Sequence, residues 1–181
     1  LSPNPTNAGS IVTWYSDGNG TYSVRIGGTS CADGTQVANG SYTSPATVDS
    51  VIAADDLFEG SNSLRVCVTD AASNSGSMTG TITKDTTAPS VSMSSSEAPP
   101  TNGLPIVVNV IFSESVTGFT SGDIIPLNGM VSNFAGSGAI YTFDLTPSAP
   151  GLVTADIAAG VAQDSADNDN TPASQFSVMA N

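Results

Sequence analysis

The residues of this chain that could do chemistry are almost all carboxylates. The 181 residues include sixteen Asp and Glu, only three Lys and Arg, and no His, which gives a formal net charge of -13. Without His, the chain can assemble neither a Ser-His-Asp nor a Cys-His arrangement, nor a zinc site that uses His. Two carboxylates can hydrolyse a glycoside, but a chain this acidic contains such pairs by chance. We therefore expect no enzymatic activity.

The acidic balance also restricts the partners. Neutralising phosphates takes clustered Lys and Arg, so nucleic acid is excluded as a partner, and an anionic membrane surface would repel the chain. No run of about 18 apolar residues is present, so we expect no membrane insertion. A cation is favoured instead, above all Ca²⁺. The alternative is that the acidity only keeps a secreted protein in solution, and composition does not separate these two interpretations.

Cys31 and Cys67 are the only cysteines, and both lie in the first half of the chain. One disulfide is the simplest interpretation, and it indicates an oxidising compartment. The alternative is a pair of unrelated buried thiols. A closed loop of this length would stabilise the first half by about 4 kcal/mol.

The elements that must position these side chains are strands, divided by a joint at residues 84–91. A strand-like run ends at Asp85, the sequence Thr86-Thr87-Ala88-Pro89 follows, and a new alternating run begins at Val91. Proline fixes its own backbone and favours an extended residue before it. The joint therefore predicts two domains, residues 1–85 and 86–181, each of a size normal for a β-sandwich.

Short alternating runs separated by Gly, Pro, Asn and Asp fill both halves, and no window of a dozen residues has helical periodicity. The clearest runs cover residues 10–16, 63–69 and 106–113. Turns are expected at residues 17–20 and 136–138, and a chain-breaking signal stands at Pro99-Pro100. The pattern predicts an all-β protein.

The two halves repeat a pattern of residue types. An aromatic residue, a serine and a carboxylate end an early run in each half, at residues 15–17 and at residues 112–114. A D-x-x-x-N sequence precedes the last run in each half, at residues 70–74 and 164–168. Such self-similarity predicts two diverged copies of one fold.

Four segments carry a resemblance to a known family: residues 84–89, 112–119, 131–138 and 158–164. With these segments the chain resembles the bacterial Ig-like repeats that occur in tandem in large extracellular surface proteins, including adhesins. The resemblance covers nearly all of residues 85–181, and in the first half it depends on residues 56–62 and 66–72. Those repeats usually have Gly before the Asn of the loop, where this chain has Ser73 and Asp167. The antibody order Cys, Trp, Cys is absent, because Trp14 precedes Cys31.

This resemblance implies two tandem Ig-like β-sandwich domains and a calcium site. In such a sandwich the N-terminus, the loop after the second strand and the last hairpin loop share one end, so acidic residues far apart in sequence would meet there. We hypothesise a Ca²⁺ at the joint between the domains, and an equivalent site at the outer pole of the first domain. The alternative is that these Asp and Asn residues only bond their local backbone in turns. The proposed ligands at the joint are Asp85, Glu114, Asp164 and Asn168, with Asp55 or Asp56 from the first domain, and those at the outer pole are Asp17 and Asp70.

The expected function is structural. We expect extender repeats in the stalk of a bacterial cell-surface or secreted adhesin, rigidified by calcium, monomeric, with neighbouring Ig-like repeats as partners. The chain begins at Leu1 without a leader, so we take it as an excerpt of a longer protein. One alternative is a module that itself binds a glycan or host protein, which exposed aromatic side chains gathered on one face would favour. Another is an accessory portion of a secreted polysaccharide-degrading enzyme.

Overall fold

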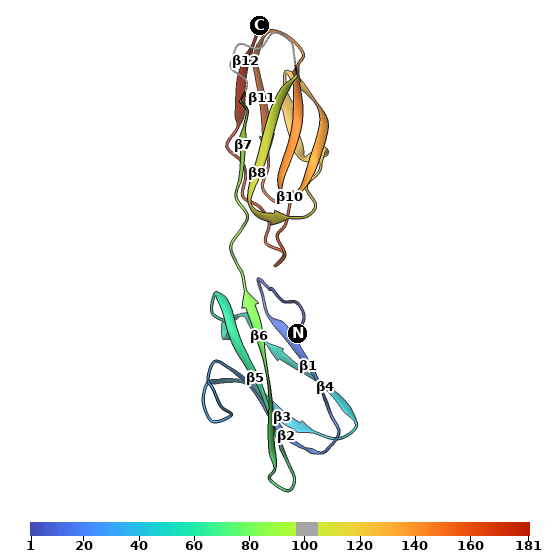
Figure 1. Ribbon diagram of the computed structural model, residues 1–181, viewed down its shortest axis with the longest axis vertical. Helices are drawn as coiled ribbons and strands as arrows, with labels where there is room; N and C mark the ends of the chain where they lie inside the picture. The colour runs from blue at the N-terminus through green and yellow to red at the C-terminus, as the bar shows by residue number, and fades with distance from the viewer. Residues whose placement is uncertain (97–104) are drawn as a thin grey trace. The chain divides into compact units, whose positions relative to one another are not determined.

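The computed structural model describes residues 1–96 and 105–181, and its regular elements are β-strands and two short 3-10 turns (Figure 1). The chain-breaking signal expected at Pro99-Pro100 lies outside the described residues. The chain forms two compact units, Leu1–Thr86 and Thr87–Asn181, so the division falls one residue after the boundary expected from sequence. Each unit has its own hydrophobic core. Within the described ranges, no helix is long and apolar enough to span a membrane.

The first unit packs a two-stranded sheet against a four-stranded sheet. The small sheet pairs β1 (Ser10–Ser16) antiparallel with β4 (Ala46–Ile52). The large sheet has the order β3-β2-β5-β6, all antiparallel, and the 3-10 turn η1 (Ala54–Asp56) precedes β5. Its strands are β3 (Thr35–Tyr42), β2 (Gly20–Ile26), β5 (Gly60–Asp70) and β6 (Ser75–Lys84).

Alternation along β1 decides which side chains enter this core. Val12 and Trp14 are buried, whereas Ile11 and Tyr15 on the other face are exposed. The Trp14 ring contacts Tyr22 and Tyr42 edge to face, with centroids 5.2 and 5.3 Å apart. Trp14 is therefore the centre of an aromatic cluster that joins the two sheets.

A disulfide joins Cys31 to Cys67 across 36 positions of sequence, with their Cα atoms 5.9 Å apart. Cys67 lies on β5, and Cys31 belongs to the loop between β2 and β3. The predicted disulfide is confirmed, and the alternative of two unrelated thiols is wrong.

The N-terminal segment of the first unit links the edges of its two sheets. Ser2 forms an antiparallel bridge with Ile11 of β1, and Thr6 forms a parallel bridge with Lys84 of β6. The Thr6 N–H donates to the Thr83 carbonyl at 3.0 Å, and the Asp85 N–H donates to the Thr6 carbonyl at 2.9 Å. The backbone of this segment pairs through single bridges, because its Pro and Asn residues interrupt any regular ladder. The Asn4 side chain adds two bonds to β6: it donates to the Thr81 carbonyl and accepts the Thr83 N–H, each at 2.9 Å.

The second unit also consists of two sheets. One has the order β10-β8-β7 and the other the order β12-β11-β9. The 3-10 turn η2 (Ser121–Asp123) precedes β9. The strands are β7 (Val91–Ser94), β8 (Ile106–Val116), β9 (Ile124–Leu127), β10 (Gly129–Pro147), β11 (Gly151–Ile157) and β12 (Phe176–Ala180).

The inward face of β8 forms the middle of this second core. Ile106, Val108 and Val110 are fully buried and Phe112 is 2% exposed, as the alternation predicts. The other face remains apolar at Val107, which is 45% exposed. Phe112 packs edge to face against Phe119 and Tyr141.

The β10 element doubles back on itself at the expected turn. The Asn133 side-chain amide donates to Asp144 at 2.7 Å, and the Ser148 N–H donates to the Asn128 carbonyl at 3.0 Å, so its two ends lie together. At the turn, Gly136 has φ 121°, and a Cβ there would lie 2.3 Å from the Ile140 carbonyl oxygen. Only glycine fits this turn, which is why the glycine-rich sequence marks it.

Candidate functional site

Three carboxylates predicted to bind calcium lie together. The side chains of Asp85, Glu114 and Asp164 each place an oxygen within 4.8 Å of the others, and no other such group of His, Cys, Asp or Glu is present in the part of the chain that the structure describes. Asp85 follows β6 directly, Glu114 lies near the end of β8, and Asp164 opens the loop of residues 164–168. Asp164 is 3% exposed, whereas the other two are half-buried.

The loop that follows Asp164 holds its carboxylate in place. One carboxylate oxygen accepts the N–H groups of Ala166 at 2.7 Å and of Asn168 at 2.9 Å. The other accepts the side-chain amide of Asn168 at 2.9 Å. Asn168, predicted as a calcium ligand, therefore contacts Asp164 through its nitrogen and positions that carboxylate. These bonds satisfy a buried charge that would otherwise be costly.

The first unit contains the same loop at Asp70. Its carboxylate accepts the N–H groups of Ala72 at 2.9 Å and Asn74 at 2.8 Å, and the Asn74 side-chain amide at 2.8 Å. The bonds from Asn74, side chain first and then backbone, hold the pKa of Asp70 below its usual value. The loop itself is thus common to both domains, as the repeated D-x-x-x-N sequence predicts.

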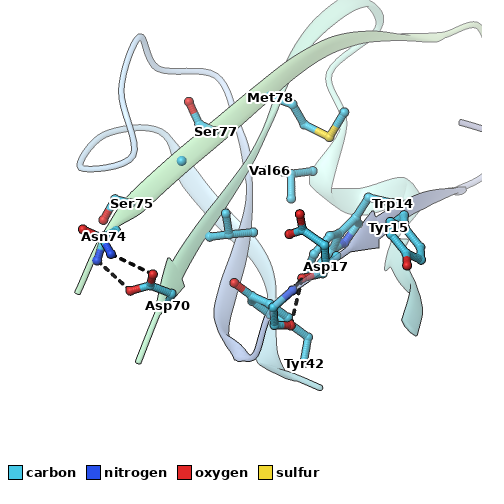
Figure 2. Close-up of a pocket in the computed structure, with 14 residues that line it drawn as sticks. Trp14, Tyr15, Asp17, Tyr42, Val66, Asp70, Asn74, Ser75, Ser77 and Met78 are labelled. Atoms are coloured by element: carbon cyan, nitrogen blue, oxygen red, sulfur yellow. Dashed lines mark hydrogen bonds between the residues drawn. The ribbon is translucent and has the colours of Figure 1, made fainter. Parts of the chain in front are cut away.

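At the predicted outer site only two acidic residues share one cavity. Asp17 and Asp70 both line a hollow of about 470 Å³, together with Trp14, Tyr15 and Tyr42 (Figure 2). In that view the Asp70 carboxylate faces Asn74, and Asp17 lies apart from it beside the aromatic residues. Within the described ranges, no third acidic group joins them. This pole therefore offers a cation fewer carboxylates than the cluster at Asp85 does.

Two of the acidic residues between β4 and β5 bond groups within the first unit. Asp55 and Asp56 lie on η1, where the Asp56 carboxylate accepts the Ala53 N–H at 3.2 Å. Neither belongs to the three-carboxylate group. Glu59 lies in the same acidic stretch but was not among the predicted ligands, and its carboxylate accepts both the backbone N–H and the hydroxyl of Thr86 at 2.9 Å. These two bonds, backbone first, lower the pKa of Glu59 and tie the end of the first unit to its own sheet.

The donor set at Asp85, Glu114 and Asp164 suits a hard cation. All three groups offer oxygen, and Ca²⁺ takes six to eight oxygens from carboxylates, carbonyls and water. Three carboxylates at this spacing repel one another, and a divalent cation removes that repulsion. The absence of His from the chain excludes the nitrogen ligands that many transition-metal sites use. The residues present therefore fit calcium.

Comparison with known proteins adds a family and two similar structures. The family model of a bacterial Ig-like domain matches residues 85–180. The fibronectin(III)-like modules of Clostridium thermocellum CbhA give a TM-score of 0.44 at 14% identity, over 99% of this chain and 91% of that chain. The Bacteroides ovatus protein SGBP-B of a mixed-linkage glucan utilization locus, in complex with a mixed-linkage heptasaccharide, gives 0.29 at 14% identity, over 94% of this chain and 40% of that chain. No curated protein matches the chain. At 14% identity and with TM-scores below 0.5, neither similar structure is evidence for the function of this chain.

Proposed function

Because the chain belongs to the bacterial Ig-like domain family, whose model matches just over half of it, we propose that its two domains are extender repeats in the stalk of a bacterial cell-surface or secreted adhesin. In this role the chain has no catalytic activity. It holds another part of the protein at a distance, and calcium rigidifies the connection between its domains.

The observation that carries this proposal is the group formed by Asp85, Glu114 and Asp164. The family match begins at residue 85, so Asp85 opens the matched domain. A Ca²⁺ held by these carboxylates would fasten the start of that domain to the end of β8 and to the loop at Asp164. The segment that leads into the domain would then have fewer conformations, and the stiffness of the stalk would depend on the ion.

The exposed side chains support a spacer over a binding module. Among the large hydrophobic side chains that the structure describes as exposed, only Tyr15 and Phe58 are aromatic, and they belong to different segments of the first unit. A glycan-binding face takes aromatic rings gathered on one surface. The surface is otherwise rich in small polar residues, which suits a chain that must stay in solution.

The test compares melting and small-angle scattering of the chain in millimolar CaCl₂ and in EDTA. A ligand at about a hundred times its dissociation constant adds close to 3 kcal/mol to the state that binds it. We expect Ca²⁺ to raise the melting temperature of the second domain and to narrow the distribution of shapes in scattering. Identical melts would contradict calcium binding. A raised melting temperature with unchanged scattering would keep the ion and contradict its stiffening role.

Matched variants locate the ion. Glu114→Gln removes one proposed ligand with little change in size, and we expect it to abolish most of the calcium response. Asp144→Asn is the control, because it removes one charge from the same domain at a residue paired with Val107, at the other end of β8 from Glu114. Loss of the response in both variants would indicate a diffuse charge effect and would contradict a defined site.

A further inference from the structure

A hollow of about 470 Å³ in the first unit lies where β1 ends and where β5 and β6 turn back on each other (Figure 2). Two aromatic residues, Trp14 and Tyr42, and three other apolar ones, Val66, Val68 and Met78, contribute to its lining. Sites for small ligands have volumes of about 300–1,000 Å³, so this hollow has room for one.

A glycine in β6 leaves this hollow open. Gly76 pairs with Val68 and lies two residues before Met78, on the same face of the strand. Its backbone is not in the left-handed region, and an added Cβ would meet only Val68, at an ordinary distance of 3.5 Å. Neither the backbone nor the packing therefore requires glycine at this position. Glycine inside a strand often marks a place where a ligand approaches the backbone closely. Met78 is 57% exposed, so an apolar side chain faces water beside this glycine.

Two carboxylates supply charge to the hollow, and none of the described residues that line it is basic. The bonds from Asn74 lower the pKa of Asp70, so this carboxylate is ionised at neutral pH. Asp17 is exposed, and in the described part of the chain its side chain makes no hydrogen bond or ion pair. Figure 2 shows Asp17 between Val66 and Tyr42. The hollow therefore has a negative potential and one carboxylate that is available to a ligand.

We propose that this hollow binds an organic cation, an ammonium or guanidinium group carried on an apolar stem. Asp17 pairs with the cationic group, and Asp70 adds negative charge to the same hollow. The stem lies against Val66 and Met78 in the space that β6 leaves open. The aromatic residues of the lining favour the same ligand, because the face of an aromatic ring attracts a cation. The site belongs wholly to the first unit, and it does not depend on the calcium proposed at Asp85.

Other classes of ligand fit this lining less well. Ca²⁺ takes six to eight oxygens, whereas the hollow combines two carboxylates with an apolar wall. An anion would be repelled by Asp17 and Asp70. A neutral apolar ligand would remove water from the Asp17 carboxylate and offer it no partner, which costs free energy. A cation with an apolar stem suits both the carboxylate and the wall.

Trp14 is the only tryptophan of the chain, so its fluorescence reports on the hollow. The test titrates the full chain with n-hexylammonium chloride and follows this fluorescence. Hexan-1-ol has the same stem without the charge, ammonium chloride has the charge without the stem, and CaCl₂ supplies a metal. We expect saturable binding of hexylammonium, roughly tenfold or more tighter than that of the alcohol or of ammonium. No saturable change with hexylammonium, or equal affinity for hexan-1-ol, would overturn the proposal. Tighter binding of Ca²⁺ that displaces hexylammonium would also overturn it.

Matched variants test the role of the carboxylate. Asp17→Asn keeps the size of the side chain and removes its charge, and we expect it to weaken hexylammonium binding roughly tenfold. Asp55→Asn is the control, because Asp55 is an exposed carboxylate of the same domain that does not line the hollow. This control is expected to bind hexylammonium as the wild type does. Equal loss in both variants would indicate a general charge effect and would overturn a defined site.

Two further variants test the position of the ligand. Gly76→Val fills the hollow with a side chain that strands favour, so we expect it to lose hexylammonium binding while the melting temperature of the first domain stays the same or rises. Met78→Thr, at an exposed position, removes part of the apolar wall without filling the hollow. It should weaken binding roughly fivefold, and it keeps the test decisive if Gly76→Val lowers stability. Unchanged affinity in both variants would overturn the assignment to this hollow.

A capped lysine identifies the source of the cation. Nα-acetyl-lysine amide carries an ammonium group on a polypeptide backbone, and n-butylammonium, which has the same four-carbon stem, is its reference. Equal affinity for the two would support a lysine side chain of another polypeptide as the ligand. Binding of butylammonium without binding of the capped lysine would support a free amine. Failure of both to compete with hexylammonium would overturn the proposal.

Discussion

Ser73 and Asp167 hold equivalent positions in the two domains and share a left-handed backbone, with φ of 68° and 65°. Each precedes the Asn of a D-x-x-x-N loop, where related repeats usually have Gly. In both loops the Asn backbone carbonyl accepts the Asp N–H, at 2.9 Å for Asp70 and 3.2 Å for Asp164. The loop bonds hold a conformation that residues with a Cβ adopt at a cost.

We expect Ser73→Gly to stabilise the first domain and Asp167→Gly to stabilise the second. Glycine adopts positive φ without the steric cost of a Cβ, so each substitution should raise the free energy of unfolding by about 1 kcal/mol. Urea denaturation of each variant measures this. Ala72→Gly, in the same loop but outside the set of positive-φ residues, is the control and is expected to give no gain. A loss of stability in Ser73→Gly as large as in the control would contradict the argument.

Removing the disulfide should destabilise the first domain alone. With both Cys31 and Cys67 replaced by Ala, the unfolded chain loses a cross-link between residues 36 positions apart. The loop-entropy model gives a loss of about 4 kcal/mol. Calorimetry should then show a lower transition for the first domain, with the transition of the second domain as the internal reference. A shift of both transitions would show that the two domains unfold as one unit.

Asp33 should make the stability of the first domain sensitive to acid. Its carboxylate accepts backbone N–H bonds from Thr29 and Ser30 and bonds from both hydroxyls, and these hold its pKa well below the ordinary value. A lowered folded-state pKa contributes stability that is present above the unfolded value of about 4 and is lost as the pH falls toward the folded value.

The variant Asp33→Asn should therefore be less stable than the wild type at pH 7, and the difference should shrink as the pH falls below about 4. Urea denaturation of both proteins at a series of pH values, from neutral to strongly acidic, measures this difference in stability. Asp55→Asn, which removes one exposed charge from the same domain, controls for net charge. A difference between Asp33→Asn and wild type that is constant across this range would contradict the contribution of the carboxylate.

The sequence predicted the strands and the repeated loops because each depends on local pattern. Alternation along β8 placed Phe112 inside, and the D-x-x-x-N sequence marked a loop whose bonds all lie within five residues. The prediction failed to identify Glu59 as the partner of Thr86, since that contact joins residues 27 positions apart and no local signal marks it. It also did not anticipate that the irregular N-terminal segment bridges β1 and β6, because single bridges leave no alternating pattern.

For the candidate calcium ligands, the grouping of distant residues could be predicted, and the direction of one local side chain could not. Topology implied by the family resemblance was enough to bring Asp85, Glu114 and Asp164 together. Topology could not predict the direction of the Asn168 side chain. Whether its oxygen points outward or its nitrogen donates to Asp164 depends on side-chain geometry within the loop.

Asp85, Glu114 and Asp164 repel one another, so the effect of Glu114→Gln on the stability of the second domain should change sign when calcium is added. In EDTA, Glu114→Gln should make the second domain more stable, since two carboxylates about 4 Å apart repel by about 1 kcal/mol even at the dielectric constant of water. In saturating CaCl₂ the same variant should be less stable than the wild type, because it has lost a ligand. Melting both proteins in both buffers measures this, with Asp144→Asn as the charge-matched control. If Glu114→Gln shifts stability in the same direction in both buffers, Glu114 does not bind the ion.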